Sequence, residues 1–409
     1  MLLQLAWRNI WRNKRRTLIT ISAIAFSVFL SAFMVSLNKG IFDSMLNGAI
    51  EQYFGYAQIH GADYWEDKVI DNSIAFNETL QAIPKNVAEV EDIIPRIETF
   101  ALASAKDLTA GAFVIGIDPT KENKLTNIEE KIVQGTYLKT NQDAVIIAEG
   151  LAEKLKLQLN DTLVLLSQGY HGVNAAGKYP IQGIFKMGLP DLNKSLVYMP
   201  IETAAYFLGA EGRATTLVLK IDNEKIVPQA IANIQNYIPA DQQYALKSWQ
   251  QLMPELVETR QLKEGGNYVF IGILYLLISF AIFGTILMMT KERSYEFGVL
   301  TAIGMRRKKL FSIIWLETVM VAVVGAIVGI LMSMPLVYYL KVQPLTVEMM
   351  GEEAAAAYEK FGLQGSLPAT FELPIFLYQA LIIFLITSIL AIYPLFKIMR
   401  LKPVEAMRE

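Results

Sequence analysis

Four long hydrophobic runs interrupt an otherwise mixed sequence of 409 residues. They cover Thr17–Leu37, Tyr268–Thr290, Leu310–Leu340 and Leu373–Phe396, and Glu317 is the one charged residue within them. A helix needs about 20 apolar residues to cross a bilayer, so each run predicts one transmembrane helix. The third run is longer than one bilayer requires, and we expect this helix to tilt or to project from the membrane.

Charged residues between these runs predict the orientation of the chain. Lysine and arginine concentrate in residues 1–16, 291–309 and 397–409, whereas the loop 341–372 contains more glutamate than lysine. Cytoplasmic loops of membrane proteins carry an excess of lysine and arginine. We therefore expect both termini and residues 291–309 in the cytoplasm, and residues 38–267 and 341–372 outside.

The outer segment, residues 38–267, alternates between strand and helix patterns. "FGYAQIHG", "AFVIGID", "TLVLL", "SLVYMP" and "ATTLVLKID" are typical of strands, and "AEGLAEKLKL", "IETAAYFLG" and "EKIVPQAIANIQNYI" of helices. The alternation at both ends, with a strand-rich middle, predicts an α/β domain with an inserted β-rich subdomain at about 130–205. The predicted fold class is a membrane protein with one transmembrane helix, this large extracytoplasmic domain, and three further transmembrane helices.

Composition agrees with such a mixture and excludes several functions. Hydrophobic residues make up 53% of the chain and charged residues 19%, with a mean hydropathy of +0.34. The formal net charge of −2 gives no bulk signal for nucleic acid binding. The chain has no cysteine, and its two histidines, His60 and His171, lie far apart and outside an HExxH motif. We predict no catalytic residue and no metal site in this chain.

The stretch "GVNAAGKY" comes close to a nucleotide-binding P-loop. Gly172, Gly177 and Lys178 have the right spacing, but Tyr179 stands where a Ser or Thr would bind Mg²⁺. The stretch also lies in the outer segment, and an extended Pro-containing segment follows it where a P-loop requires a helix. We therefore predict a hairpin loop here, and we expect ATP and Mg²⁺ to bind to a separate subunit.

Two cytoplasmic segments have amphipathic patterns. Residues 1–16 predict an interfacial helix in which Leu3, Trp7, Ile10 and Trp11 oppose Arg8, Asn9, Arg12, Asn13 and Arg16, although the basic residues alone could serve only as a topology signal. Residues 291–309 predict a short helix from Glu292 to Ile303 with Gly304 as its C-cap. Phe297, Leu300 and Ile303 would then lie in water unless a partner covered them, whereas a solvated loop would leave this apolar surface unexplained.

The cytoplasmic motif carries a resemblance to a known family. Residues 291–309 resemble the coupling helix of the MacB/LolC/LolE/FtsX-like ABC transporter permeases, and the matching residues are Glu292, Arg293, Glu296, Phe297, Gly298, Leu300, Ala302, Ile303 and Gly304. The ending "KPVEAMRE" is similar to the basic tail of that family, and "LAWRNIWRNKRRT" to its N-terminal elbow. The order of one span, a large outer domain and three spans is also that of the family, and the layout is closest to the lipoprotein-releasing permeases LolC and LolE.

This resemblance implies a set of partners and a mechanism. A second permease, the same or homologous, and two copies of a cytosolic ABC ATPase would complete the transporter in the bacterial inner membrane. ATP hydrolysis below would move the outer domains above, which would consist of a Porter-like unit with an inserted Sabre-like subdomain. The expected function is lipoprotein release or export of a hydrophobic substrate. The alternative is an FtsX-like signalling permease that transports nothing and activates an outer partner such as a cell-wall hydrolase.

The resemblance also suggests two sets of contact residues. A cleft for lipid or lipoprotein would involve the first and second spans, through Phe26, Phe29, Phe33, Met34, Phe270, Leu274 and Leu277, although ordinary packing or lipid contact is open for each. A hairpin at residues 168–178 would meet a periplasmic carrier or adaptor through Gly169, Tyr170, His171, Asn174 and Lys178, and its alternative is a flexible hairpin tip.

Three residues within the third span and one stripe after it complete the candidates. Glu317 either pairs with the basic loop or lies at a dimer interface or gate, because a charge within a span is costly. Gly325 and Gly329 form a small-xxx-small face that favours packing against another helix of the same chain. In the loop 341–372, the apolar residues Val347, Met350, Ala354, Tyr358 and Phe361 predict a short amphipathic helix.

Overall fold

The computed structural model describes residues 7, 8, 10–12, 14–140, 142–238, 244–346 and 366–399. The chain divides into two compact units. A membrane unit comprises Met1–Asp43, Thr259–Leu345 and Leu367–Glu409, and an outer unit comprises Ser44–Glu258 and Thr346–Ser366. The stripe predicted between Val347 and Phe361 lies outside the described residues.

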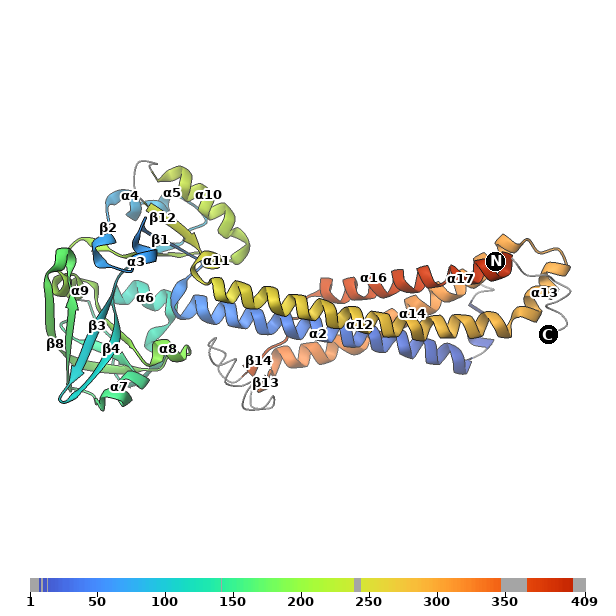
Figure 1. Cartoon of the computed structure of the whole chain (residues 1–409), viewed down its shortest axis with the longest axis horizontal. Helices are drawn as coiled ribbons and strands as arrows, with labels where there is room; N and C mark the ends of the chain where they lie inside the picture. Colours follow the sequence, from blue (N-terminus) through green and yellow to red (C-terminus); the bar gives the residue numbers. More distant parts are fainter. Residues whose placement is uncertain are drawn as a thin grey trace. The chain divides into compact units, whose positions relative to one another are not determined.

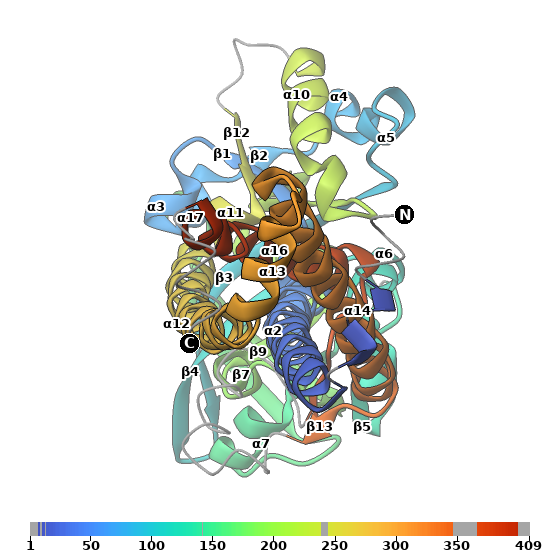
Figure 2. The same cartoon turned by 90° about the vertical axis from the view of Figure 1, so that its right-hand side faces the viewer.

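Four long apolar helices confirm the predicted spans. They are α2 (Lys14–Ala49), α12 (Pro254–Glu292), α14 (Arg307–Val342) and α16 (Leu373–Leu390), and the short helices α13 (Ser294–Ala302) and α17 (Tyr393–Met399) accompany them (Figure 1). Figure 2 views the membrane unit nearly along its helices, which lie side by side as a bundle.

Two of these helices are much longer than the hydrophobic runs that predicted them. α2 has 36 residues and α12 has 39, which at about 1.5 Å per residue gives roughly 54 and 59 Å. The hydrocarbon core is only about 30 Å thick. The predicted domain limits at residues 38 and 267 therefore fall inside helices, because hydrophobicity marks where a helix leaves the membrane and not where it ends.

All four long helices contribute to one apolar cluster in the bundle. Its buried members are Ile10, Ile24, Val28, Ile282, Ile286, Val321, Ala322, Ala326 and Ile383. α14 approaches α2 closely at Gly325 and Gly329. A Cβ atom at Gly325 would lie 2.7 Å from the Ile24 side chain, and one at Gly329 would lie 2.6 Å from the Ala25 carbonyl oxygen. The small-residue face thus packs within the chain, as predicted.

The fourth span differs from its prediction as a single helix over 373–396. α16 ends at Leu390, and α17 begins at Tyr393 after a two-residue turn. Pro394 accounts for this break, because proline has no backbone N–H to donate to the carbonyl of Leu390 and its ring clashes with that carbonyl.

Ten strands of the described outer unit form one sheet. They are β1 (Ala57–Gly61), β3 (Asp92–Ala105), β4 (Leu108–Ile117), β5 (Ile132–Gly135), β6 (Val145–Ala148), β7 (Thr162–Gln168), β8 (Asn174–Phe185), β9 (Leu196–Pro200), β11 (Thr216–Lys220) and β12 (Tyr244–Ser248). Their order is β12-β1-β11-β3-β4-β9-β6-β8-β5, and β7 pairs with β3 and β8. Short strands form two further pairs, β2 (Ile74–Ala75) with β10 (Arg213–Ala214) and β13 (Leu345–Thr346) with β14 (Ser366–Leu367).

Short helices surround this sheet. They are η1 (Ile50–Phe54, a π-helix), α3 (Tyr64–Asp67), η2 (Ile70–Asn72), α4 (Glu78–Gln81), α5 (Ile83–Asn86), α6 (Pro119–Thr126), η3 (Ile128–Lys131), α7 (Glu149–Leu155), η4 (Tyr170–Gly172), α8 (Pro190–Asn193), α9 (Ile201–Leu208), η5 (Glu224–Ile226), α10 (Val227–Tyr237) and α11 (Trp249–Leu252). The predicted strands correspond to β1, β4, β7, β9 and β11, and the predicted helices to α7, α9 and α10, which confirms these elements.

Separate hydrophobic clusters lie along the sheet. One cluster joins β1 and β11 with α5 and α10, whereas two others lie on β3, β4 and the strands that follow. β3 contributes to two of these clusters, because Ile93 packs in the cluster of β1 and β11, and Ile97 and Ala101 pack in one of the other two. The outer unit is therefore a continuous α/β sheet structure. The inserted subdomain at about 130–205 stays a prediction, and β5, β6, β8 and β9 of that segment lie together at one end of the sheet.

Candidate functional site

Helix α13, which the sequence predicts in the cytoplasm, has well-defined ends. α12 ends at Glu292, and Arg293 adopts φ −96° and ψ 5° before α13 begins at Ser294. At the other end the backbone N–H of Met305 donates to the Leu300 carbonyl at 3.0 Å, and Gly304 has φ +98°. This is the glycine-containing helix end that the sequence predicted, since a left-handed backbone favours glycine. The helix starts two residues later than predicted because Glu292 completes α12.

The inner face of α13 packs against the same chain. Phe297 is only 1% exposed and forms a cluster with Leu310, Ile314 and Ile398. Leu300 packs against this cluster and is partly buried. The prediction that Phe297 lies in water unless a partner subunit covers it is therefore wrong: α14 and α17 cover it. An amphipathic pattern shows that a face is covered, but it does not show which element covers it.

The outer face of α13 carries different residues. Tyr295 is 56% exposed and Ile303 is 79% exposed. Sequence reasoning included Ile303 and missed Tyr295, which the helical period places away from Phe297. These two large side chains form the available apolar surface of the described part of this loop. Gly298 lies buried beside Phe297, and Glu292 is exposed at the end of α12.

Ion pairs connect α13 to two other parts of the membrane unit. Glu296 accepts hydrogen bonds from Arg12 Nη2 at 2.5 Å and from Arg293 Nε at 3.3 Å. Arg293 Nη1 also donates to Glu317 Oε2 at 2.7 Å, and Glu317 on α14 is only 5% exposed. Of the two interpretations of Glu317, pairing with the basic loop is therefore observed, and the pair is buried. Arg12 was assigned only to the polar face of the N-terminal helix, and no sequence signal indicated Glu296 as its partner.

This network affects the ionisation of its exposed members. Burial favours the neutral form of Glu296, but hydrogen bonds from Arg12 and Arg293 outweigh it and lower the pKa of the carboxyl. The hydrogen bond to Glu296 raises the pKa of Arg12. α13 is thus held by two charged contacts as well as by its apolar cluster.

The N-terminal helix has exposed tryptophan side chains, which are expected of an interfacial segment. Trp7 and Trp11 are exposed, and their rings lie 6.0 Å apart. Ile10 is instead buried in the bundle cluster, so the predicted apolar face is partly exposed and partly packed in the bundle, and Leu3 lies outside the described residues.

The residues proposed for a lipid cleft are exposed or half-buried. Phe26, Phe270 and Leu277 are exposed, whereas Phe29, Phe33, Met34 and Leu274 are half-buried. The Phe26, Phe29 and Phe33 rings follow one another along α2 with centroids 6.2 and 6.3 Å apart. They form a continuous aromatic strip.

The P-loop-like stretch forms a β-hairpin, as predicted. β7 and β8 pair antiparallel from Thr162 with Pro180 to Gln168 with Asn174, so a strand and not a helix follows Gly172. Its tip is packed as well as exposed. The guanidinium of Arg213 stacks on the Tyr170 ring at 4.6 Å, and Gly169 is buried. The other three residues predicted to meet a carrier, His171, Asn174 and Lys178, are exposed.

The two histidines have unrelated environments. His60 is buried in β1, and burial lowers its pKa to about 3. The backbone N–H of His171 in η4 donates to Asp71 at 2.6 Å. Among the described residues, no group of three or more His, Asp or Glu side chains has the arrangement of a metal site.

Comparison with known protein families shows which family the chain belongs to. Residues 17–237 match the MacB-like periplasmic core domain, over more than half of the chain, and residues 268–403 match the FtsX-like permease C-terminal domain. The chain belongs to the MacB/FtsX-like ABC transporter permease family. Members of this family are transmembrane permeases, so this permease is not itself expected to be an enzyme.

Two similar curated proteins are the lipoprotein-releasing system transmembrane proteins LolC of Xylella fastidiosa strains 9a5c and Temecula1. Each is 19% identical to this permease, over 326 and 323 residues, covering 77% of this chain and 76% of the relative.

Similar solved structures include the extracellular domain of YknZ from Gram-positive bacteria, with 14% identity, a TM-score of 0.34, and coverage of 47% of this chain and 99% of that domain. The periplasmic region of MacB from Actinobacillus actinomycetemcomitans has 12% identity, a TM-score of 0.35, and coverage of 53% and 94%.

Proposed function

We propose that this permease couples ATP hydrolysis by a separate cytosolic ABC ATPase to movement of its outer unit. The observation that supports this most directly is the two-sided structure of α13. Its inner face is fixed to α14 and α17 through Phe297, and its outer face presents Tyr295 and Ile303. Exposed aromatic and aliphatic side chains are typical anchors of protein interfaces.

The connections of α13 suit it to transmit force. α13 lies between α12 and α14 in the chain, and the pair of Arg293 with Glu317 adds a charged connection to α14. A partner that displaces α13 must therefore displace the cytoplasmic ends of two spanning helices. A loop without such packing would absorb the displacement locally.

The assembly that we propose follows from this role. The permease would lie in the bacterial inner membrane with both termini in the cytoplasm, as the basic segments predict. It would pair with a second permease, the same or homologous, and bind two ATPase copies that hold ATP and Mg²⁺. We keep the coupling residues that the family resemblance implies. Phe297 and Leu300 would contribute by packing on the inner face of α13.

The proposed substrate class is lipoprotein, or another hydrophobic molecule, with or without a periplasmic carrier. Two relatives are named as lipoprotein-releasing proteins, and the aromatic strip of Phe26, Phe29 and Phe33 provides an accessible apolar surface. A carrier would meet the exposed hairpin residues His171, Asn174 and Lys178. If the purified complex hydrolyses ATP but releases no lipid-modified protein, the signalling function becomes the better explanation.

The substitution Ile303→Asp tests the docking face. We expect the variant to fold and insert, because Ile303 is 79% exposed, but to lose affinity for the cognate ATPase by at least about 30-fold, the equivalent of roughly 2 kcal/mol for an interface anchor. The measurement is co-purification of the ATPase with the tagged permease, together with the ATP hydrolysis rate of the complex.

Tyr206→Asp provides the matched control, because Tyr206 is exposed on α9 of the outer unit and the change adds the same charge. It should retain the ATPase. If Ile303→Asp also binds the ATPase with wild-type affinity, α13 does not dock it, and the proposed function loses its main support.

A further inference from the structure

A pocket of about 380 Å³ lies in the outer unit, where α2 ends and α12 begins. Its walls come from the end of α2, from η1, from the residues around α8 and from the junction of α11 with α12. The volume falls within the roughly 300–1,000 Å³ that is typical of small-molecule sites. The proposed coupling function does not use this pocket.

The walls of the pocket are largely apolar. Met45 of α2 and Met253, between α11 and α12, are only 1% and 8% exposed, and methionine side chains adapt to irregular shapes. Tyr53 and Phe54 of η1 add two rings in an edge-to-face arrangement, with centroids 4.9 Å apart. The Tyr53 hydroxyl donates to Glu98 at 2.7 Å, which fixes the orientation of this ring. The pocket therefore suits a ligand with an apolar or aromatic body.

The charged residues that line the pocket are both acidic. They are Asp191 of α8 and Glu255 of α12, and no lysine or arginine of the described residues lines the pocket. Both side chains are exposed, and neither carboxylate has an ion pair or hydrogen bond within the described part of the chain. A cation at the mouth of this pocket would be attracted, whereas an anion would be repelled.

One buried cation lies behind the pocket wall but does not oppose this preference. The Arg96 guanidinium stacks on the Tyr53 ring at 4.8 Å and is not among the residues that line the pocket. Glu122 pairs with Arg96 at 2.7 Å, and both side chains are fully buried. The charge of Arg96 is therefore balanced within the protein, and the two carboxylates at the mouth determine which charge the pocket favours.

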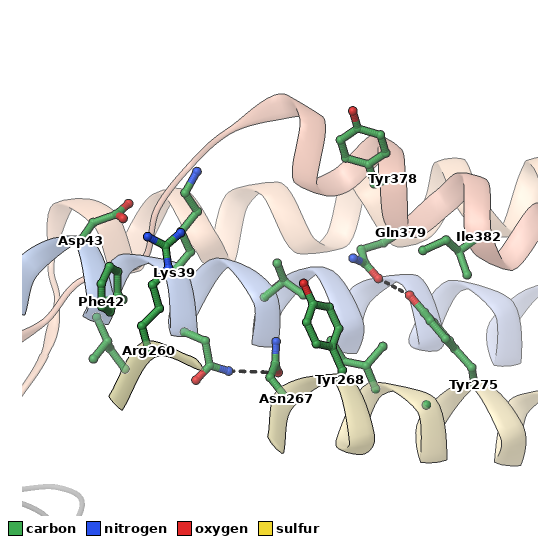
Figure 3. Close-up of a pocket in the computed structure, with 15 residues that line it drawn as sticks. Lys39, Phe42, Asp43, Arg260, Asn267, Tyr268, Tyr275, Tyr378, Gln379 and Ile382 are labelled. Atoms are coloured by element: carbon green, nitrogen blue, oxygen red, sulfur yellow. Dashed lines mark hydrogen bonds between the residues drawn. The ribbon is translucent and has the colours of Figure 1, made fainter. Parts of the chain in front are cut away.

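The larger cavity of the membrane unit, of about 610 Å³, has no such preference (Figure 3). Lys39, Asp43 and Arg260 bring charges of both signs to its lining. Lys39 Nζ also donates to Glu372 at 2.6 Å, so this cation is already engaged. The uniform sign of its charges thus distinguishes the pocket of the outer unit.

The pocket lies beyond the apolar runs of both helices that contribute to it. Met45 is about 12 Å along α2 from Leu37, and Glu255 is roughly 20 Å along α12 from Tyr268. The headgroup region adds only about 5–8 Å on each side of the hydrocarbon core. A ligand would therefore reach the pocket from the aqueous compartment outside the membrane and not from the bilayer.

We propose that this pocket binds a small organic cation, an amphipathic amine. The apolar or aromatic body of the ligand lies among Met45, Phe54 and Met253, and its ammonium group lies at Asp191 and Glu255. A phosphate or carboxylate ligand is disfavoured, because it would bring a negative charge to two carboxylates. The pocket shares no residue with the aromatic strip of α2 or with the exposed hairpin residues, so this ligand is additional to a transported substrate.

Three dansyl probes test the charge preference. Dansylcadaverine carries an amine on an apolar tether, its N-acetyl derivative is neutral, and dansyl-6-aminohexanoate is an anion with a similar body. The full-length permease is titrated in phosphatidylcholine nanodiscs, and the fluorescence of empty nanodiscs is subtracted. We expect saturable binding, with dansylcadaverine at least about fivefold tighter than the neutral probe and with the anion weakest. Equal affinities for the three probes, or binding that does not saturate, would overturn the proposal.

Removal of the two carboxylates locates the ammonium group. Asp191→Asn combined with Glu255→Gln should weaken dansylcadaverine binding at least about threefold and leave the neutral probe unchanged. Asp107→Asn combined with Glu202→Gln is the matched control, because these two carboxylates are also exposed in the outer unit but do not line the pocket. If the two double variants behave alike, the ammonium group lies elsewhere and the proposal is wrong.

A further pair of variants locates the body of the probe. Leu189 is half-buried in the pocket wall, and Leu189→Lys should weaken dansylcadaverine binding at least about tenfold, because the new ammonium group competes for the carboxylates. Gly272→Leu is the control, since this residue lines the larger cavity (Figure 3) and its Cβ atom would meet no other atom within 4 Å. Wild-type binding by Leu189→Lys, or loss of binding in Gly272→Leu, would contradict the proposed site. These readouts require no ATPase, so failure of the coupling hypothesis would leave them unaffected.

Discussion

The pair of Arg293 and Glu317 explains how a carboxyl side chain is tolerated within a transmembrane helix. A buried charge is costly unless it is paired and hydrogen-bonded. Arg293 contacts both Glu317 and Glu296, and Arg12 completes a group of two cations and two anions. The charges balance, and the buried one, Glu317, has the shortest contact with Arg293.

Glu317→Gln should therefore destabilise the permease. The amide removes one negative charge, so that Arg293 and Arg12 share Glu296 as the remaining carboxylate of this group, and breaking a buried ion pair typically costs about 3–5 kcal/mol. We expect a clear drop in the thermal unfolding midpoint of the permease purified in detergent.

Glu372→Gln is the control, because Glu372 pairs with Lys39 but both side chains are more than 40% exposed. An exposed pair contributes only about 0–1 kcal/mol. Equal unfolding midpoints for the two variants would show that the pair of Glu317 with Arg293 does not stabilise the folded permease.

At the scale of elements, periodicity and helix-end signals predicted much of the coupling region. The apolar spacing and Gly304 identified α13 and its end within two residues. The covering of Phe297 by α14 and α17 was not predictable, because one sequence pattern serves both intramolecular and intermolecular burial. Pro394 signals the break between α16 and α17. The hydrophobic run continues past it to Phe396, however, and therefore predicted a single helix.

The packing of α14 on α2 is a close contact between helices of the bundle. A Cβ atom at Gly329 would lie 2.6 Å from the backbone oxygen of Ala25 and 2.7 Å from Val28. Backbone atoms cannot move aside as a flexible side chain can. Gly329 thus allows an approach that other residues would prevent.

Gly329→Leu should force these helices apart, with a cost of at least about 1–3 kcal/mol for overpacking. We expect a lower unfolding midpoint and poor membrane expression. Gly284→Leu should have little effect on either, because no atom would lie within 4 Å of its Cβ. If Gly329→Leu matches the wild type in both measurements, the close approach is not required.

At the scale of the whole molecule, the proposed coupling requires that the outer unit respond as one body. Its sheet is continuous through β3, a 14-residue strand that contributes to clusters on both parts of the unit. The sequence predicted the flanking elements, but β3 was missed because residues 93–99 are buried without alternation, and residues 100–105, whose burial alternates, are apolar or small on both faces. A strand buried on both faces lacks the period-two pattern that identifies strands.

A buried ion pair joins β3 to α6, and the same arginine also contacts η1, the helix that follows α2. The Arg96 guanidinium makes two hydrogen bonds to Glu122, at 2.9 and 2.7 Å, and both side chains are fully buried. Arg96 Nη1 also donates to the Tyr53 carbonyl of η1 at 2.7 Å. This carbonyl lies in the last turn of its helix, where backbone acceptors lack partners within the helix. Burial lowers the pKa of Arg96, but the charge of Glu122 and its hydrogen bonds outweigh it, so the guanidinium remains ionised.

Replacing this pair should separate stability from coupling. Arg96→Met alone leaves Glu122 buried and unpaired and should cost about 3–5 kcal/mol. Adding Glu122→Leu should restore most of the stability, because an apolar replacement of a buried pair is often neutral. The double variant would still lack the bond to the Tyr53 carbonyl. We therefore expect normal ATPase binding and near-normal unfolding, but less substrate released per ATP hydrolysed. Wild-type release per ATP in the stable double variant would mean that β3 moves with α2 without this contact.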